Sequence, residues 1–237
     1  CYQLIPFMNH VDIYSYKIAY YSFVLLAFGI PMLIYAFFTL NFDYSAIVGG
    51  VCIVSSVGLV LVNLYKTLRV SNIMNINSIY ILISIFLLFI TVCIGLLMIV
   101  NFNYSFLSVH SLHYLSLHVH VGIAGWFLIL IIGVSSRLFP MFLVSTYLND
   151  SLLKTILVTI HIGLFNYLLW HMDIIPTYFY WFSIAAFGSS ICMYIYFCVQ
   201  VYRNRFHKNN NTLLDLSGVS LIFLGVSVFI TCLVTYF

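Results

Sequence analysis

Long apolar runs separated by short polar connections dominate the chain. A transmembrane helix needs about 20 consecutive, mostly apolar residues, and seven runs reach that length. They cover Tyr16–Leu40, Ser45–Tyr65, Ser78–Val100, Tyr114–Val144, Ser151–His171, Thr177–Tyr202 and Leu213–Tyr236. Pro31 and the pair Gly49-Gly50 interrupt the first two runs, which membrane helices tolerate when neighbours satisfy the freed backbone groups. The pattern predicts an all-α, polytopic membrane helix bundle of about seven transmembrane helices, forming one transmembrane domain over residues 1–237.

The composition excludes the main water-soluble classes of protein. Of the 237 residues, 64% are hydrophobic and only 5% carry a full charge, whereas a soluble domain is about a quarter charged. Disorder requires low hydrophobicity and high charge, and a nucleic-acid-binding surface requires clustered cations. Eight scattered Lys and Arg residues meet neither condition. The lipid bilayer is therefore the expected partner, and nucleic acid is not.

All eight basic residues fall on one side of the predicted bundle. They are Lys17, Lys66, Arg69, Arg137, Lys154, Arg203, Arg205 and Lys208. Cytoplasmic loops of membrane proteins carry the excess of Lys and Arg, so we expect this side to face the cytoplasm. Residues Cys1 to Pro6 read as the end of a helix rather than as a natural start. We therefore expect the sequence to be part of a longer chain.

The segment from Leu117 to Phe142 carries the polar residues that suggest chemistry. Its sequence is LHVHVGIAGWFLILIIGVSSRLFPMF. Polar groups at membrane depth are costly and usually functional, and side chains two residues apart on a helix point about 200° apart. We therefore expect His118 and His120, near the outer end of their span, to serve two different centres. Three glycines leave room either for a flat macrocycle or for a close neighbouring helix with the histidines hydrogen-bonded between helices. These glycines are Gly122, Gly125 and Gly133.

The same segment resembles the tenth helix of the catalytic subunit of heme-copper oxidases. The shared pattern is H-x-H-x-G-x-x-G-W, a further Gly and an apolar pair before Pro. It is also similar to C-family oxidases, NnrS proteins and bacterial membrane proteins labelled oxidase subunit I-like. The resemblance implies that His118 binds a high-spin heme iron and His120 a low-spin heme iron. It further implies the bacterial inner (cytoplasmic) membrane with both histidines toward the outer side, electron transfer or oxygen or nitric oxide chemistry, and respiratory subunits or a cytochrome as partners.

A second, shorter similarity to these proteins lies at the start of the chain, in YQLIPFM. It resembles the end of a preceding His-bearing helix, which implies that the partner ligand of the low-spin heme lies upstream. The oxidases also bind copper through a His and an adjacent His pair between the two matched segments. Here the three spans between Pro6 and His118 contain no His, and the chain has no His-His pair. A heme-copper centre of that kind is not expected, so the sequence leaves open whether the protein is an oxidoreductase.

Two further histidines are candidate metal ligands in later spans. His171 closes its span beside Asp173, whose carboxylate could orient the ring. His161 lies at mid-depth, where it could bind a metal, relay protons or hydrogen-bond between helices. Besides a purely structural membrane subunit without a cofactor, two functions therefore stay open. One is an integral membrane heme protein with His118 and His120 as axial ligands. The other is a non-redox, metal- or nitric-oxide-handling membrane protein that keeps the fold without the heme-copper centre, with copper or another transition metal as a cofactor that imidazole suits.

Overall fold

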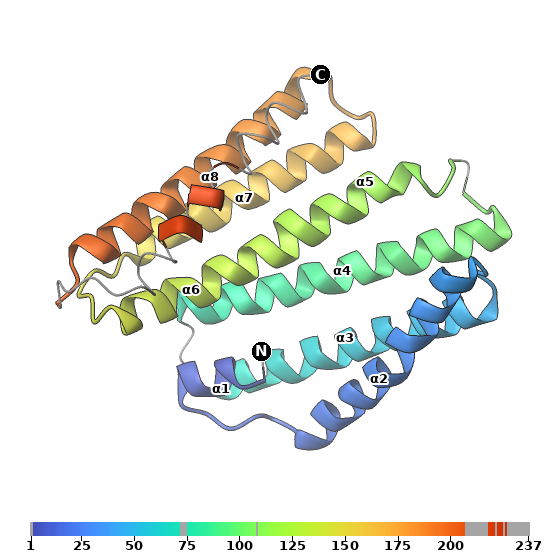
Figure 1. Cartoon of the computed structure of the whole chain (residues 1–237), viewed down its shortest axis with the longest axis horizontal. Coiled ribbons are helices and arrows are strands. Elements are labelled where there is room, and N and C mark those ends of the chain that lie inside the picture. Colours follow the sequence, from blue (N-terminus) through green and yellow to red (C-terminus); the bar gives the residue numbers. More distant parts are fainter. Residues whose placement is uncertain are drawn as a thin grey trace. The chain divides into compact units, whose positions relative to one another are not determined.

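The computed structural model is built from helices in the residues that it describes, which are 2–71, 75–107, 109–206, 218–220, 222–224 and 226 (Figure 1). The helices are α1 (Leu4–Asn9), α2 (Tyr16–Thr39), α3 (Tyr44–Ser71), α4 (Ile76–Tyr104), α5 (His113–His120), the π-helix η1 (Val121–Phe127), α6 (Leu128–Phe142), α7 (Asp150–His171) and α8 (Tyr178–Arg203). The chain divides into two compact units, with residues 1–133 in unit 1 and residues 134–237 in unit 2.

Six helical segments among the described residues are long and apolar enough to cross a membrane. They are α2, α3, α4, the continuous rod α5–η1–α6, α7 and α8. The predicted all-α, multi-pass membrane architecture is therefore confirmed. The first six predicted spans are also confirmed, although α3 runs on past Tyr65 to Ser71. The seventh predicted span, Leu213–Tyr236, falls largely outside the described residues.

Helices α2 and α3 of unit 1 contact each other through two facing glycines. A Cβ atom built on Gly49 would lie 3.0 Å from the carbonyl oxygen of Gly29, and one built on Gly29 would lie 2.9 Å from the carbonyl oxygen of Gly49. Small residues allow membrane helices to approach this closely. Neither Pro31 nor the pair Gly49-Gly50 interrupts its helix.

Buried polar side chains tie α3 to the segment that precedes α2. The Asn63 amide accepts from the backbone N–H of Ser15 (3.1 Å) and donates to its carbonyl oxygen (2.9 Å). The Thr67 hydroxyl accepts from the backbone N–H of Tyr14 (3.1 Å). Both α3 side chains are fully buried. Backbone groups just before a helix lack intrahelical partners, and these two residues supply them.

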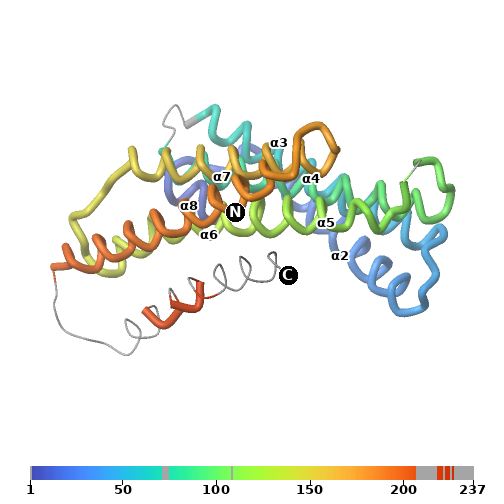
Figure 2. The backbone as a smooth tube through the Cα atoms, turned by 90° about the horizontal axis from the view of Figure 1, so that it is seen from above, coloured from blue at the N-terminus to red at the C-terminus, as the bar shows by residue number. Residues whose placement is uncertain are grey.

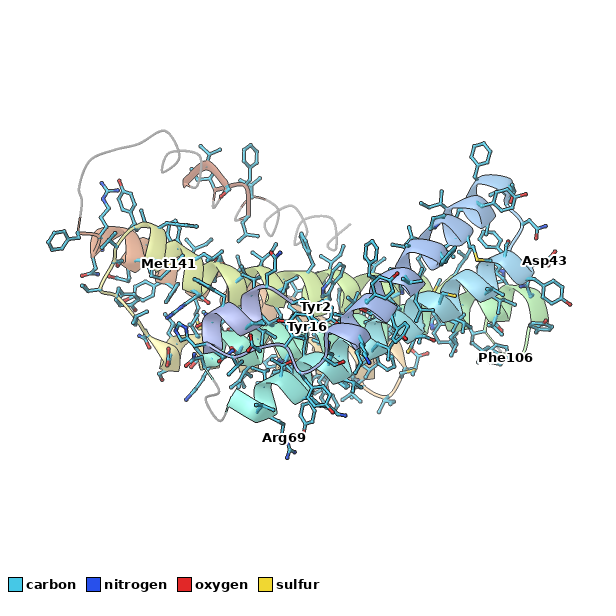
Figure 3. The ribbon with its side chains drawn as sticks, turned by 90° about the horizontal axis from the view of Figure 1, so that it is seen from below. Tyr2, Tyr16, Asp43, Arg69, Phe106 and Met141 are labelled. Carbon is cyan, nitrogen blue, oxygen red and sulfur yellow. The ribbon has the colours of Figure 1, made fainter. Side chains whose placement is uncertain are left out.

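Helices α4 and α5 of unit 1 run side by side (Figures 1 and 2). The Asn101 amide, near the end of α4, donates to the hydroxyl of Ser111 in the following turn (2.9 Å). Figure 3 shows Phe106 of this turn and Asp43 of the α2–α3 turn at the end of unit 1 that lies opposite Arg69. The turn before α5 is therefore fastened to α4 at the end of the unit that lacks the basic residues.

Unit 2 is built around the pair α7 and α8. The Asn149 side chain caps α7 by accepting from the backbone N–H of Leu152 (2.9 Å). A Cβ on Gly163 of α7 would lie 3.3 Å from the ring of Phe187 on α8. The hydroxyls of Ser135 and Tyr194 are 2.6 Å apart, which links the last part of α6 to α8.

Candidate functional site

The two histidines of the H-x-H motif lie on α5, and the π-helix η1 begins at the next residue. His118 and His120 are both half-buried. At the end of η1, the backbone N–H of Leu128 donates to the carbonyl oxygen of Ile123, five residues earlier. The π-helix is rare and occurs frequently at functional sites. The segment that resembles the oxidase helix therefore departs from regular helix geometry within the motif itself, which the sequence analysis did not predict.

The His118 imidazole faces α4. A Cβ built on Gly95 would lie 3.1 Å from Cε1 of His118 and 3.5 Å from its Nδ1, so the ring rests on bare α4 backbone. Nδ1 is buried there and has no hydrogen-bond partner among the described residues. A buried, unsatisfied polar atom costs about 1–3 kcal/mol. Packing against Gly95, rather than a hydrogen bond from Nδ1, therefore holds this ring in place.

Side chains of α4 also fill the space beside two glycines of the motif. A Cβ on Gly122 would lie 3.2 Å from Cγ2 of Thr91, and one on Gly133 would collide with Tyr80. The Asn77 amide of α4 donates to the carbonyl oxygen of Gly133 (3.0 Å), which joins α4 to α6 at the position of this glycine. Of the two uses that the sequence left open for these glycines, close helix packing is the one observed at both positions. A flat macrocycle does not fit between α4 and the rod at these points.

His120 has a different environment, although it lies only two residues further along α5. Its Nδ1 lies 2.8 Å from the carbonyl oxygen of Ser116, one turn earlier on the same helix. A carbonyl oxygen only accepts, so Nδ1 carries the proton in this hydrogen bond, and in the neutral ring Nε2 presents a lone pair. Metal-binding imidazoles are commonly oriented in this way by a backbone carbonyl. In this tautomer Nε2 is the ring atom through which His120 would bind a metal, and its role as a metal ligand stays a prediction.

The environment of His120 suits an axial ligand of a heme iron better than that of His118 does. An axial ligand must offer an oriented imidazole nitrogen, and His120 does so, whereas the His118 ring is packed against α4 backbone. Heme propionates usually pair with Arg or other strong donors. The basic residues of unit 1 lie toward the end opposite the α4–α5 turn, as Figure 3 shows for Arg69. Propionates near His120 would therefore need neutral donors or another chain.

In unit 2, His161 repeats the arrangement of His120. Its Nδ1 lies 2.7 Å from the carbonyl oxygen of Leu157, so its Nε2 is again the atom that could bind a metal or accept a proton. His171 ends α7 as predicted, is buried and stacks on Tyr167, with ring centroids 6.0 Å apart. Over the described residues, no three His, Cys, Asp or Glu side chains form a group that could hold a metal ion. As single metal ligands, both histidines stay predictions.

Two residues of α4 that contact the motif, Thr91 and Gly95, were not predicted from the sequence. Thr91 and Gly95 are four residues apart, so they lie on one face of α4. The Thr91 side chain packs against Gly122, and the His118 ring packs against Gly95. The signal was present as a pair of small residues at helical spacing inside an apolar run, a pattern typical of helix interfaces in membranes. Which helix they would contact depends on the tertiary structure.

Comparisons with known proteins found no match: no family model, no curated protein and no solved structure matches this chain. The resemblance of the segment Leu117–Phe142 to oxidase subunit I therefore stays a prediction based on its own residues.

Proposed function

We propose that this chain is an integral membrane heme protein in which His120 is an axial ligand of the heme iron. The observation that carries the proposal is the 2.8 Å contact of His120 Nδ1 with the Ser116 carbonyl oxygen, which leaves Nε2 as the donor atom. An imidazole in a membrane-spanning helix, oriented by its own backbone and followed by a π-helix, suits metal binding. When bound, the heme would supply one-electron transfer and the binding of oxygen or nitric oxide.

In this proposal His118 is a positioning residue for His120. Its ring fills the notch over Gly95 and so restricts rotation of α5 about its own axis. Side chains two residues apart point about 200° apart, so holding His118 against α4 directs His120 away from α4. A metal ligand on a rigid element, supported by the packing of its neighbours, is preorganised for binding.

The proposal includes a setting and partners. Electrons would reach the heme from another respiratory subunit or a cytochrome, which could also supply a second axial ligand. The membrane would be the bacterial inner membrane, with His120 toward its outer side, as the distribution of basic residues favours. The reaction would be electron transfer or oxygen or nitric oxide chemistry.

A second candidate function is porphyrin-free handling of a transition metal or of nitric oxide. The filled contacts at Gly122 and Gly133 favour it, because they remove the space beside these glycines that a macrocycle would use. Elemental analysis separates the two functions. Iron in a one-to-one ratio with porphyrin supports the heme protein, and copper, zinc or iron without porphyrin supports the alternative.

The direct test is a pyridine hemochrome assay and a visible spectrum of the full chain, purified from heme-replete cells. We expect a heme signal in the unaltered protein, its loss in His120→Ala, and its retention in His118→Ala with a shifted or broadened spectrum. His113→Ala, at the exposed start of α5, is the matched control and should leave the spectrum unchanged.

Two results would decide against this assignment. A colourless protein from heme-replete cells would reject heme binding. Loss of a separate, high-spin component of the spectrum in His118→Ala would instead restore the two-heme arrangement that the resemblance implies.

A further inference from the structure

We propose that the basic end of unit 2 binds the phosphate-bearing headgroup of an anionic phospholipid. This end comprises the later residues of α6, the first turns of α7, and the end of α8 with residues 204–206. The proposal does not depend on heme binding, since none of these residues belongs to the H-x-H site.

The charge at this end is strongly positive. Four cations, Arg137, Lys154, Arg203 and Arg205, face one carboxylate, Asp150, among the described residues of unit 2 at this end. Arg137, Lys154 and Arg203 are exposed, and within the described part of the chain they form no ion pair. Three cations without a protein counter-ion at a membrane boundary are available to the phosphate groups of lipids.

A short backbone clasp, made of residues 144–146 and 204–206, holds the segment that contains Arg205 against the connection between α6 and α7. The backbone N–H of Phe206 donates to the carbonyl oxygen of Val144 (3.2 Å), and that of Thr146 donates to the carbonyl oxygen of Asn204 (3.4 Å). Val144 has a φ of 47°, a left-handed conformation that is costly for a β-branched residue. The clasp therefore holds the end of α8 against the α6–α7 connection at the expense of local strain.

Arg205, which lies within the clasp, is oriented by an aromatic ring. The guanidinium carbon of Arg205 lies 3.9 Å from the centroid of the Tyr202 ring. A stacked guanidinium keeps its N–H groups in one plane. Nη1 of Arg205 is buried, so a phosphate would contact the rest of the group. Stacking thus reduces the conformational freedom that Arg205 would lose on binding a phosphate.

Exposed apolar side chains lie in the same segments of unit 2 as the cations, which favours a lipid over a free phosphate ion. They are Phe142 (73% exposed), Val144 (61%), Leu148 (67%) and Phe206 (75%). A soluble anion gains nothing from these side chains, whereas the upper acyl chain and glycerol of a phospholipid would cover them. A combination of cations and apolar side chains at one end of membrane-spanning helices is the chemistry that recognises an anionic lipid.

The test is native mass spectrometry of the purified full chain, titrated with phosphatidylglycerol or with phosphatidylcholine of the same acyl chains. We expect preferential binding of phosphatidylglycerol. The double variant Arg203→Gln, Arg205→Gln should weaken that binding by about 30-fold, because each cation near the surface contributes roughly fivefold. The charge-conserving double variant Arg203→Lys, Arg205→Lys keeps the charge but removes the planar guanidinium of Arg205. Its affinity should lie between those of the unaltered protein and the glutamine variant, which separates loss of charge from loss of fold.

The matched control is the double variant Lys66→Gln, Arg69→Gln at the basic end of unit 1. These two cations match the varied pair in number and also lie beside tyrosines, with Lys66 Nζ 3.4 Å from the Tyr14 hydroxyl and Arg69 Nε 2.8 Å from that of Tyr65. We expect phosphatidylglycerol binding to stay unchanged. Equal weakening by both glutamine pairs would show attraction to surface charge in general and overturn the proposal. Displacement of the lipid by excess inorganic phosphate would show an anion site without lipid selectivity and overturn it as well.

Discussion

Among the helix pairs of unit 1 that pack through glycine, two use it differently. Between α2 and α3, Gly29 and Gly49 face each other, so backbone meets backbone with no side chain between them. Between α4 and the rod that carries the motif, each glycine receives a side chain instead: Gly95 receives the His118 ring and Gly122 receives Thr91.

This difference separates packing from chemistry. A glycine that meets another glycine brings two helices close and does nothing more. A glycine that receives an imidazole also fixes the rotation of the helix that bears it, and here a second imidazole, His120, lies two residues further along. Small residues in a membrane span therefore point to a functional site only where the side chain that they accommodate belongs to one.

The largest effect is expected from Gly49→Leu. The new Cβ would lie 3.0 Å from the Gly29 carbonyl oxygen and 3.1 Å from the backbone nitrogen of Leu33, and backbone atoms cannot move aside as a side chain can. We expect a loss of about 3 kcal/mol in the free energy of unfolding, at the upper end of the cost of overpacking. Thermal denaturation followed by circular dichroism in detergent measures it. Gly218→Leu is the control, because no heavy atom of the described residues lies within 4 Å of a Cβ there.

A smaller effect is expected from Gly95→Ala, because the atom in the way is the edge of the His118 ring, 3.1 Å from the new Cβ. We expect a loss of about 1 kcal/mol. A double-mutant cycle with His118→Ala sharpens the comparison, since removal of the ring should remove the cost of the added methyl. A coupling of at least about 0.5 kcal/mol is expected. Additive effects of the two substitutions would show that the ring does not occupy this notch.

The smallest effect is expected from Gly163→Ala in α7. Its nearest neighbours are ring atoms of Phe187 at 3.3 Å and Cβ of Ala186 at 3.4 Å, which is close to ordinary contact. Alanine is favoured over glycine within a helix by roughly 1 kcal/mol, and this gain should offset the tight contact. We expect a change in stability within about 0.5 kcal/mol of zero, measured by the same denaturation. A large loss would mean that glycines of all three helix pairs are equally constrained.

The described fold was largely predictable from sequence, and the candidate site was only partly so. Runs such as Tyr16–Leu40 and Ser151–His171 predicted their helices almost to the residue, because every backbone group in a membrane must be satisfied within the segment. The opposite directions of His118 and His120 follow from helix geometry alone. The π-helix at Val121–Phe127 did not follow, because its hydrogen bonding leaves no periodic signal in seven residues.

The sequence by itself determined that this is a multi-pass membrane protein and, to within about six residues, where its described spans begin and end. Apolar length and backbone hydrogen bonding are local properties of each segment, so no neighbour is needed to read them. Only the tertiary structure decided what the glycines of the motif accommodate, and that His118 lies against Gly95 while Nδ1 of His120 contacts its own helix. Those outcomes depend on which surface α4 presents, and pairs of membrane helices choose each other by side-chain shape rather than by hydrophobicity.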